Sequence, residues 1–200
     1  GAYNTSMGSQ VLVSNTTGSR NSAIGFFALL ENTTGNDNVS IGNFSMQNNR
    51  AGNGGIAIGN YSMYNINNTT TPFTNTNIAI GHGAYLGSFT LANNTGLANN
   101  VIGSNALNAN SSGSRNNALG TESLSKNTSG SGNIAIGYRT LYNNIDASNS
   151  IAIGDSSLFS NGIGANITFD EGQANTAVGS KSFKSNTRGK FGTAIGGRAL

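Results

Sequence analysis

The sequence of 200 residues contains no cysteine and no tryptophan, a single proline, and only 8% charged residues. Without cysteine the chain can form neither a disulfide framework nor a thiolate metal site. No apolar stretch approaches the length of a membrane span, and no signal-type apolar segment opens the chain. We therefore expect no membrane insertion by this segment and a core that is held together by packing and hydrogen bonds alone.

Charge is sparse, and the positive charge is uneven along the chain. The formal net charge is +3. A basic end can attract phosphate or an anionic glycan, but no aromatic residues that could stack on bases interleave with these cations. We expect a solvated patch and no nucleic-acid partner. The cations that crowd the end of the chain are Lys181, Lys184, Arg188, Lys190 and Arg198.

Glycine recurs at a fixed interval, in most copies after an isoleucine. The steps between successive members of the column are 17, 17, 17, 22, 22, 17, 17, 17, 25 and 17 residues, so the base period is 17 with insertions of five, five and eight. A fixed period of this length is typical of a solenoid. The chain begins and ends inside a repeat, and we expect it to be one repeat domain, residues 1–200, cut from a longer fibre. The column is Gly8, Gly25, Gly42, Gly59, Gly81, Gly103, Gly120, Gly137, Gly154, Gly179 and Gly196.

Two positions of the repeat are large and apolar in every copy. One directly precedes the glycine, and the other follows it by four residues. We expect these two columns to face each other across the core of each coil. The predicted core residues are Ile24, Ile41, Ile58, Ile80, Ile102, Ile136 and Ile153 in the first column, and Leu29, Leu107, Leu124, Leu141 and Leu158 in the second.

A column of small residues precedes the isoleucine column. Neighbours in an extended segment point to opposite faces, so an inward isoleucine predicts an outward alanine. An outward position that faced only water would tolerate larger polar residues, and a single thin stack of coils buries few large side chains for its length. We therefore predict a homo-oligomer in which these alanines pack against sister chains. They are Ala23, Ala57, Ala79, Ala118, Ala135, Ala152, Ala177 and Ala194.

Asparagine forms two further columns, one that opens the predicted strand and one seven residues after the glycine. Stacked asparagine amides can hydrogen-bond along the axis of a solenoid. The three insertions all fall between the leucine column and the next strand, at about 64–76, 86–98 and 159–174, which predicts loops on the outside of one site of the coil. Their aromatic residues, Tyr64, Phe73, Phe89, Phe159 and Phe169, are the candidates for ligand contact, although they could equally cover the ends of the core.

The stretches "NIAIGYRTL", "NSAIGFFALLENTTG" and "NTAVGSKSF" resemble the head repeats of YadA-like trimeric autotransporter adhesins. They are even more similar to the "NTAIGxxAL…NTTG" repeats of phage and phage-like tail fibres and of related bacterial surface proteins. The resemblance covers the whole chain. It implies an all-β fold, a left-handed parallel β-roll (β-solenoid) of about eleven coils, with three chains bundled into a rod. It also implies an extracellular location, on a cell surface or a virion.

Catalytic chemistry has little material in this sequence. The single histidine, His82, could meet its copies around a trimer axis and hold a metal or an anion, but no second ligand accompanies it. Asp170 and Glu171 are the only adjacent acidic pair. A glycosidase needs two carboxylates that flank the sugar bond, and adjacent side chains diverge, which leaves open a pairing with Asp155 or Asp146 of another chain. We predict no enzyme, no metal and no cofactor.

The predicted function is a trimeric attachment fibre that presents a surface for a host glycan or protein receptor on a rigid rod. A spacer or filament segment without a ligand is the main alternative, and a polysaccharide-degrading tail spike is a further one. An ice-binding solenoid would need an uninterrupted threonine column. The relevant column, Thr16, Thr33, Ser111, Thr128 and Thr187, is broken by Arg50 and Ile145.

Overall fold

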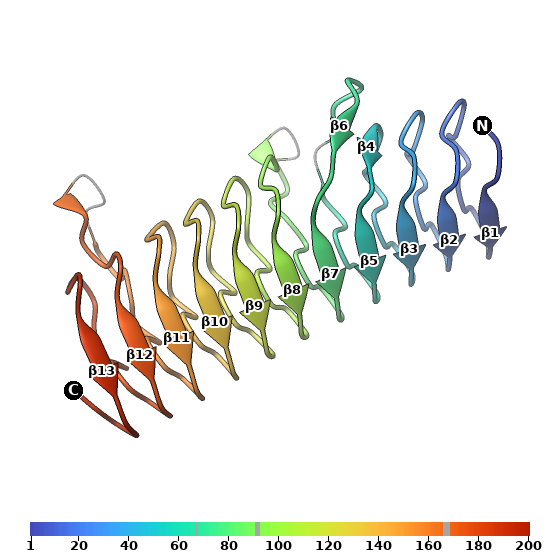
Figure 1. Cartoon of the computed structure of the whole chain (residues 1–200). Helices are drawn as coiled ribbons and strands as arrows, with labels where there is room; N and C mark the ends of the chain where they lie inside the picture. The colour runs from blue at the N-terminus through green and yellow to red at the C-terminus, as the bar shows by residue number, and fades with distance from the viewer. Residues whose placement is uncertain (67, 91–92, 166–168) are drawn as a thin grey trace.

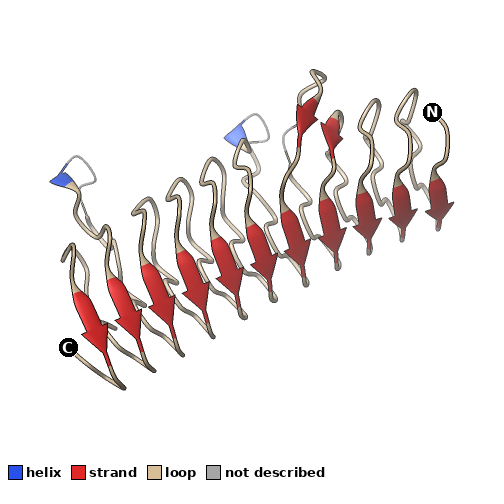
Figure 2. Cartoon of the chain, in the orientation of Figure 1, coloured by secondary structure: helices blue, strands red, loops and turns tan. Residues whose placement is uncertain are grey.

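The computed structural model of the chain describes residues 1–66, 68–90, 93–165 and 169–200, which form a β-solenoid of stacked coils. Each coil contributes one strand of three residues to a single parallel sheet of eleven strands (Figures 1 and 2). A separate parallel pair joins β4 (Gly52–Asn53) and β6 (Phe73–Thr74). The large sheet consists, in order, of β1 (Thr5–Met7), β2 (Ser22–Ile24), β3 (Val39–Ile41), β5 (Ile56–Ile58), β7 (Ile78–Ile80), β8 (Asn100–Ile102), β9 (Asn117–Leu119), β10 (Ile134–Ile136), β11 (Ile151–Ile153), β12 (Thr176–Val178) and β13 (Thr193–Ile195).

The repeat period sets the register of the sheet. Ile134, Ala135 and Ile136 of β10 pair with Ile151, Ala152 and Ile153 of β11, so each residue stacks on its equivalent in the next coil. The longer steps keep this register, because Ile56 of β5 pairs with Ile78 of β7. The extra residues leave the stack at the edge where the strands begin (Figure 1). The prediction of an all-β parallel solenoid of about eleven coils is confirmed. The first insertion is not entirely a loop, because Phe73 and Thr74 form β6.

The prediction of which residues face inward was wrong for the strands. The alanine column lies inside the single chain, with seven of its members completely buried and Ala194 4% exposed. The isoleucine column lies on the outer face, where Ile102, Ile136 and Ile153 are 46%, 38% and 37% exposed. The alanines predicted to contact sister chains are therefore interior residues: Ala23, Ala57, Ala79, Ala118, Ala135, Ala152, Ala177 and Ala194. On the outer face, Ile24, Ile41, Ile58 and Ile80 are partly buried.

The reason for this reversal is the thinness of the coil. In the coil of β3, Ser40 occupies the alanine position, and its hydroxyl lies 2.8 Å from the Ser45 hydroxyl on the opposite leg. The Ser40 hydroxyl also donates to the Ser45 backbone carbonyl, at 2.9 Å. Two legs that approach this closely leave space for a methyl or hydroxymethyl group between them, and an isoleucine there would overpack the core.

The leucine column lies in the interior of the coil but, contrary to our expectation, packs with the alanines and does not face the isoleucine column. The five leucines predicted for the core are completely buried and belong to one continuous hydrophobic core with the alanines, whereas Leu200 at the end of the stack is 86% exposed. The glycine column marks the bend between the two legs. Gly25 has φ of 137°, and a Cβ atom there would lie 2.5 Å from the carbonyl oxygen of Gly42 in the next coil. Only glycine tolerates both conditions. The buried leucines are Leu29, Leu107, Leu124, Leu141 and Leu158.

The asparagine columns form hydrogen-bonded ladders along the axis, which confirms that prediction. Asn38 donates through Nδ2 to Asn21 Oδ1 at 3.0 Å, and through its backbone N–H to the same oxygen at 3.1 Å. In the second column, Asn32 Nδ2 donates to Asn15 Oδ1 at 3.0 Å. Both Asn21 and Asn38 are completely buried. Each amide thus satisfies buried backbone groups and ties one coil to the next.

Candidate functional site

The five predicted contact residues lie in three separate insertions, with Phe73 in the strand β6, and do not form one site. Tyr64 and Phe159 are half-buried, and Phe73 packs on the hydrophobic core. The Phe159 ring stacks on Tyr142, with ring centroids 5.3 Å apart and planes within 5°. Of these three rings, Phe73 covers the core, while Tyr64 and Phe159 pack against rings of neighbouring coils. Only Phe89 and Phe169, which are 81% and 65% exposed, present most of their surface to solvent.

The second loop is closed by hydrogen bonds within it, and the third loop is tied to a neighbouring coil. Asn94, which is 1% exposed, accepts from the Ser88 N–H at 2.9 Å and donates to the Ser88 carbonyl at 2.7 Å. In the third loop, Lys190 donates to the Phe169 carbonyl at 2.8 Å. Glu171 lies 3.8 Å from Arg188, so one carboxylate of the only adjacent acidic pair faces a cation. The exposed phenylalanines therefore extend from loops whose ends are fixed.

A ladder of aromatic rings, which sequence reasoning missed, runs along the coils of β2 to β7. Phe44 and Tyr61 stack with centroids 4.8 Å apart and planes within 4°. Phe27 contacts Phe44, and His82 packs edge-on against Tyr61 at 6.3 Å. The signal was present in the sequence, because Phe27, Phe44 and Tyr61 each follow the column glycine by two residues. Only Phe44 and Tyr61 stack face to face; the other neighbouring rings meet at a tilt or edge-on.

A charged cluster continues the same side of the rod toward the C-terminus. Arg139 pairs with Glu122 of the preceding coil and lies 5.0 Å from the Tyr138 ring centroid and 5.5 Å from that of Tyr142. The hydrogen bond with Glu122 raises the pKa of the Arg139 guanidinium. Near the other end, the hydrogen bond from Arg20 lowers the pKa of Asp37. Both ion pairs join adjacent coils; the Arg20–Asp37 pair is exposed and contributes little to the free energy of unfolding, whereas the Arg139–Glu122 pair is partly buried.

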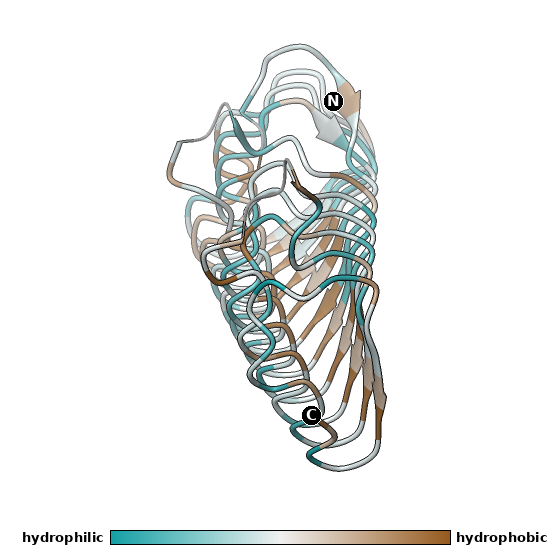
Figure 3. Ribbon diagram, turned by 90° about the vertical axis from the view of Figure 1, so that its left-hand side faces the viewer, coloured by the Kyte–Doolittle hydropathy of each residue, from teal (hydrophilic) through white to brown (hydrophobic). Residues whose placement is uncertain are grey.

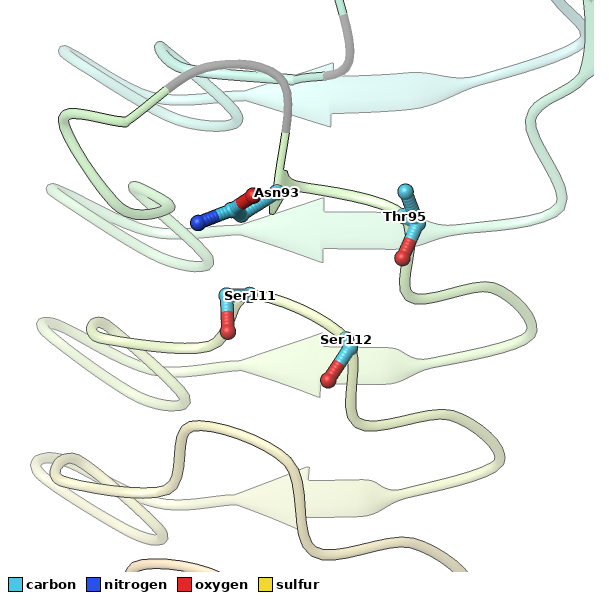
Figure 4. A pocket seen from close by; sticks show the side chains of 4 residues that line it. All are labelled: Asn93, Thr95, Ser111 and Ser112. Carbon is cyan, nitrogen blue, oxygen red and sulfur yellow. The ribbon is translucent and has the colours of Figure 1, made fainter.

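A polar pocket of about 330 Å³ lies beside the second insertion. Asn93 and Thr95 come from the insertion, and Ser111 and Ser112 come from the next coil. Figure 4 shows the hydroxyl groups of Thr95, Ser111 and Ser112 directed the same way along the stack. None of the four lining side chains is ionisable. No single motif could have indicated this site, because the two segments meet only when the insertion is folded onto the coil.

The outer face of the large sheet is an uncovered apolar surface. Figure 3 shows hydrophobic residues on the strands all along the stack. Beside the exposed isoleucines of β8, β10 and β11, Leu119 of β9 is 38% exposed. The only asparagines on this face of the eleven strands are Asn100 and Asn117, in adjacent coils. Asn100 Nδ2 donates to Asn117 Oδ1 at 2.9 Å.

The described residues offer no cluster of three or more histidine, cysteine, aspartate or glutamate side chains that could hold a metal. In the same part of the chain, no helix is long and apolar enough to cross a membrane. Four of the five hydroxyls of the threonine column, those of Thr16, Thr33, Ser111 and Thr128, donate to a carbonyl of the next coil. An ice-binding face would need such donors free to contact water.

The chain was compared with protein-family models, curated proteins and solved structures. No protein-family model, curated protein or solved structure matches the chain.

Proposed function

We propose that the chain is a segment of a homotrimeric, extracellular attachment fibre. In this proposal, three solenoids bundle through the outer faces of their large sheets. The inserted loops contact a glycan or protein receptor on a host surface. The left-handed roll and the number of three chains follow from the resemblance to adhesin heads and tail fibres, and the solenoid fold supports the same architecture.

The observation that carries the proposal is the exposed apolar face of the sheet. Contiguous apolar patches larger than a few hundred Å² are rare on monomeric proteins, and parallel sheets are normally covered on both faces. Here one face packs on the core while Ile102, Ile136 and Ile153 remain exposed in the single chain. Copies of the same chain supply a matching face in every coil, which makes self-association the economical way to cover it.

The asparagine pair on this face favours identical partners over an unrelated apolar one. Asn100 and Asn117 bond to each other, yet their remaining amide groups would lose water when the face is covered. In a parallel bundle in register, the asparagines of one chain meet the asparagines of the next and can exchange hydrogen bonds. A bundle shifted by a few coils would set these amides against isoleucine.

The remaining architecture is suited to a stiff rod. Backbone hydrogen bonds, asparagine ladders and the glycine stack join every coil to its neighbours, so that length increases by copying one unit. The inserted loops leave the rod at a single edge (Figure 1). In that place they can reach a surface without disturbing the stack.

The trimer is tested by light scattering after size exclusion. The wild-type chain should elute with the mass of three chains, and Ile102→Lys combined with Ile136→Lys should dissociate it because two charges per chain would be buried at the interface. Ser129→Lys, on an exposed position outside the sheet, is the matched control and should remain trimeric. A wild-type chain that is folded and monomeric at micromolar concentration contradicts the proposal.

The attachment role is tested by binding of the labelled fibre to candidate host cells. Phe89→Ala combined with Phe169→Ala should weaken binding by at least tenfold if the loops make the contact. Val13→Ala, which alters an exposed apolar residue away from the loops, should leave binding unchanged. A trimer that binds no cell surface, with or without these substitutions, would instead be the spacer of the alternative hypothesis.

A further inference from the structure

We propose that the pocket beside the second insertion binds an uncharged sugar unit of a surface glycan through the hydroxyl groups of the sugar. The inference rests on the attachment role and names the class of ligand that this edge of the rod would take. The four residues that carry it are Asn93, Thr95, Ser111 and Ser112.

Three of the four side chains have their hydrogen-bonding groups available. Among the described residues, the Asn93 amide and the Thr95 and Ser112 hydroxyls make no hydrogen bond. The Ser111 hydroxyl donates to the Thr128 carbonyl at 3.0 Å, which leaves its oxygen free to accept. The pocket therefore offers both donors and acceptors within a small space, and each hydroxyl of a sugar can itself donate and accept.

The arrangement of these groups is fixed by the backbone. The Gly96 N–H donates to the Ser111 carbonyl at 3.0 Å, which joins the insertion to the next coil at the pocket. The buried Asn94 binds Ser88 through both of its amide groups and closes the loop that carries Asn93. A site whose segments are held before binding loses less conformational entropy when the ligand arrives.

The chemistry of the lining excludes a charged ligand and suits a neutral one. An anionic sugar would normally be held by arginine or lysine, and none of the lining residues that the structure describes carries a charge. Charge is present in the equivalent position of other coils, where Asp146 and Arg188 stand in the place of Ser112. The volume of about 330 Å³ lies at the lower end of ligand pockets.

The test uses the full chain on an array of neutral oligosaccharides built from hexose, deoxyhexose and N-acetylhexosamine units. The same cores that carry sialic or uronic acid are printed beside them. We expect binding to a subset of neutral glycans, and a loss of at least tenfold in Asn93→Ala combined with Ser112→Ala. Ser129→Ala removes the same hydroxyl from the same position one coil further along and should bind like wild type. Thermal unfolding of all three proteins should coincide, because the altered side chains make no hydrogen bond among the described residues.

The outcomes separate this inference from the attachment role. Absence of binding to neutral glycans, binding confined to acidic glycans, or neutral binding that the double substitution leaves intact would each overturn the inference. A fibre that adheres to cells but fails on the array keeps its attachment role without this site, and its receptor would then be a protein. A fibre that binds neutral glycans through the pocket but adheres to no cell keeps the site and loses the attachment role.

Discussion

Asn75, from the first insertion, places its amide in the space that a side chain at Gly55 would occupy. A Cβ atom built on Gly55 would overlap Asn75 Nδ2. Gly55 stands where most other coils have the asparagine that opens the strand. Asn75 Oδ1 accepts from Asn77 Nδ2 at 2.9 Å and from the Asn77 N–H at 3.2 Å, as the missing asparagine would. The first insertion thus supplies, through Asn75, the ladder amide that is missing at Gly55.

Because Asn75 takes the place of the ladder asparagine at position 55, the effects of mutations at Asn75 and Gly55 should be coupled. Asn75→Ala should lower the free energy of unfolding by about 2 to 4 kcal/mol, because two buried donors of Asn77 lose their acceptor. Gly55→Asn alone should also destabilise, since its amide would collide with that of Asn75. The double variant rebuilds the standard ladder once the terminal methyl group of Met46, which a Cβ at Gly55 would also overlap, has moved aside, and it should recover most of the loss seen in Asn75→Ala. Denaturant unfolding at fixed protein concentration measures all four proteins, and additive losses would show that Asn75 does not replace the ladder amide.

Two deletions of equal length test which part of the first insertion stabilises the fold. Removal of residues 68–72 or of residues 71–75 restores the 17-residue step between the coils of β5 and β7. The first deletion keeps Phe73 and Asn75 and should leave the unfolding temperature nearly unchanged. The second removes both and should lower it by several degrees, roughly as expected for a loss of a few kcal/mol. Equal unfolding temperatures would mean that the whole insertion is dispensable for folding.

The buried Tyr85 predicts a loss of stability at alkaline pH. Tyr85 occupies the leucine column, is 1% exposed, and donates through its hydroxyl to the Gly96 carbonyl at 3.0 Å. Burial raises the pKa of Tyr85 to about 12. Because the folded pKa exceeds that of the unfolded chain, near 10, stability is fully present below about pH 10 and falls as the pH rises toward 12. The decrease should reach about 2 to 3 kcal/mol.

Tyr85→Phe provides the control for this dependence. At neutral pH the variant should lose about 1 kcal/mol with the hydrogen bond to Gly96. Between about pH 10 and pH 12 its stability should decline less steeply than that of wild type, since a phenylalanine side chain cannot ionise. Circular dichroism of thermal unfolding across this range measures both effects. Parallel pH profiles for the two proteins would refute the assignment to Tyr85.

The pair Asn100 and Asn117 should set the axial register of the proposed trimer. Replacement of both by isoleucine makes the apolar columns continuous over the middle of the face, which should stabilise the assembly but permit shifted bundles. A nitroxide label on Ser129→Cys reports the shift by pulsed electron resonance, and the chain has no other cysteine. Wild type should give one narrow distance and the double variant a broadened one. A narrow distribution in both would remove the register role.

Much of the fold follows from the sequence, because periodicity carries long-range information in a solenoid. The step between Gly59 and Gly81 predicts that Ile56 will pair with Ile78 despite the insertion, and the structure has this pair. The buried Leu29 column and the amide bond between Asn21 and Asn38 were likewise predictable. In each case a residue type repeats because each coil places it in the same surroundings.

The orientation of the strands could not be obtained in this way. Alternation shows that Ala135 and Ile136 point to opposite faces but does not say which face is inside. Hydrophobicity favoured isoleucine inside, whereas the close approach of Ser40 and Ser45 shows that the legs of the coil leave too little room. The backbone of the second leg was also unpredictable, because Leu29 adopts φ of 50°, a region where glycine or asparagine is expected.

The candidate pocket depended on tertiary structure for a similar reason. Thr95 and Ser112 lie in different coils, and only the folded insertion brings them together. The sequence also did not reveal which of the predicted aromatic residues pack on the core and which face solvent. Phe73 joins the core, and Phe89 faces solvent.

Cysteine cross-linking tests the central claim, that identical chains cover one another through the outer sheet face. Ile134→Cys and Ile136→Cys place a thiol on either side of the buried Ala135, and Ser129→Cys places one off the sheet. Under mild oxidation in dilute solution, at least one of the two sheet variants should form disulfide-linked dimers efficiently. A trimer has one thiol per chain, so one disulfide can form and the third chain stays unlinked; at most two of every three chains should be joined. Ser129→Cys should stay unlinked. Failure of both sheet variants to cross-link, or equal cross-linking at Ser129, would contradict a homotrimer built on this face.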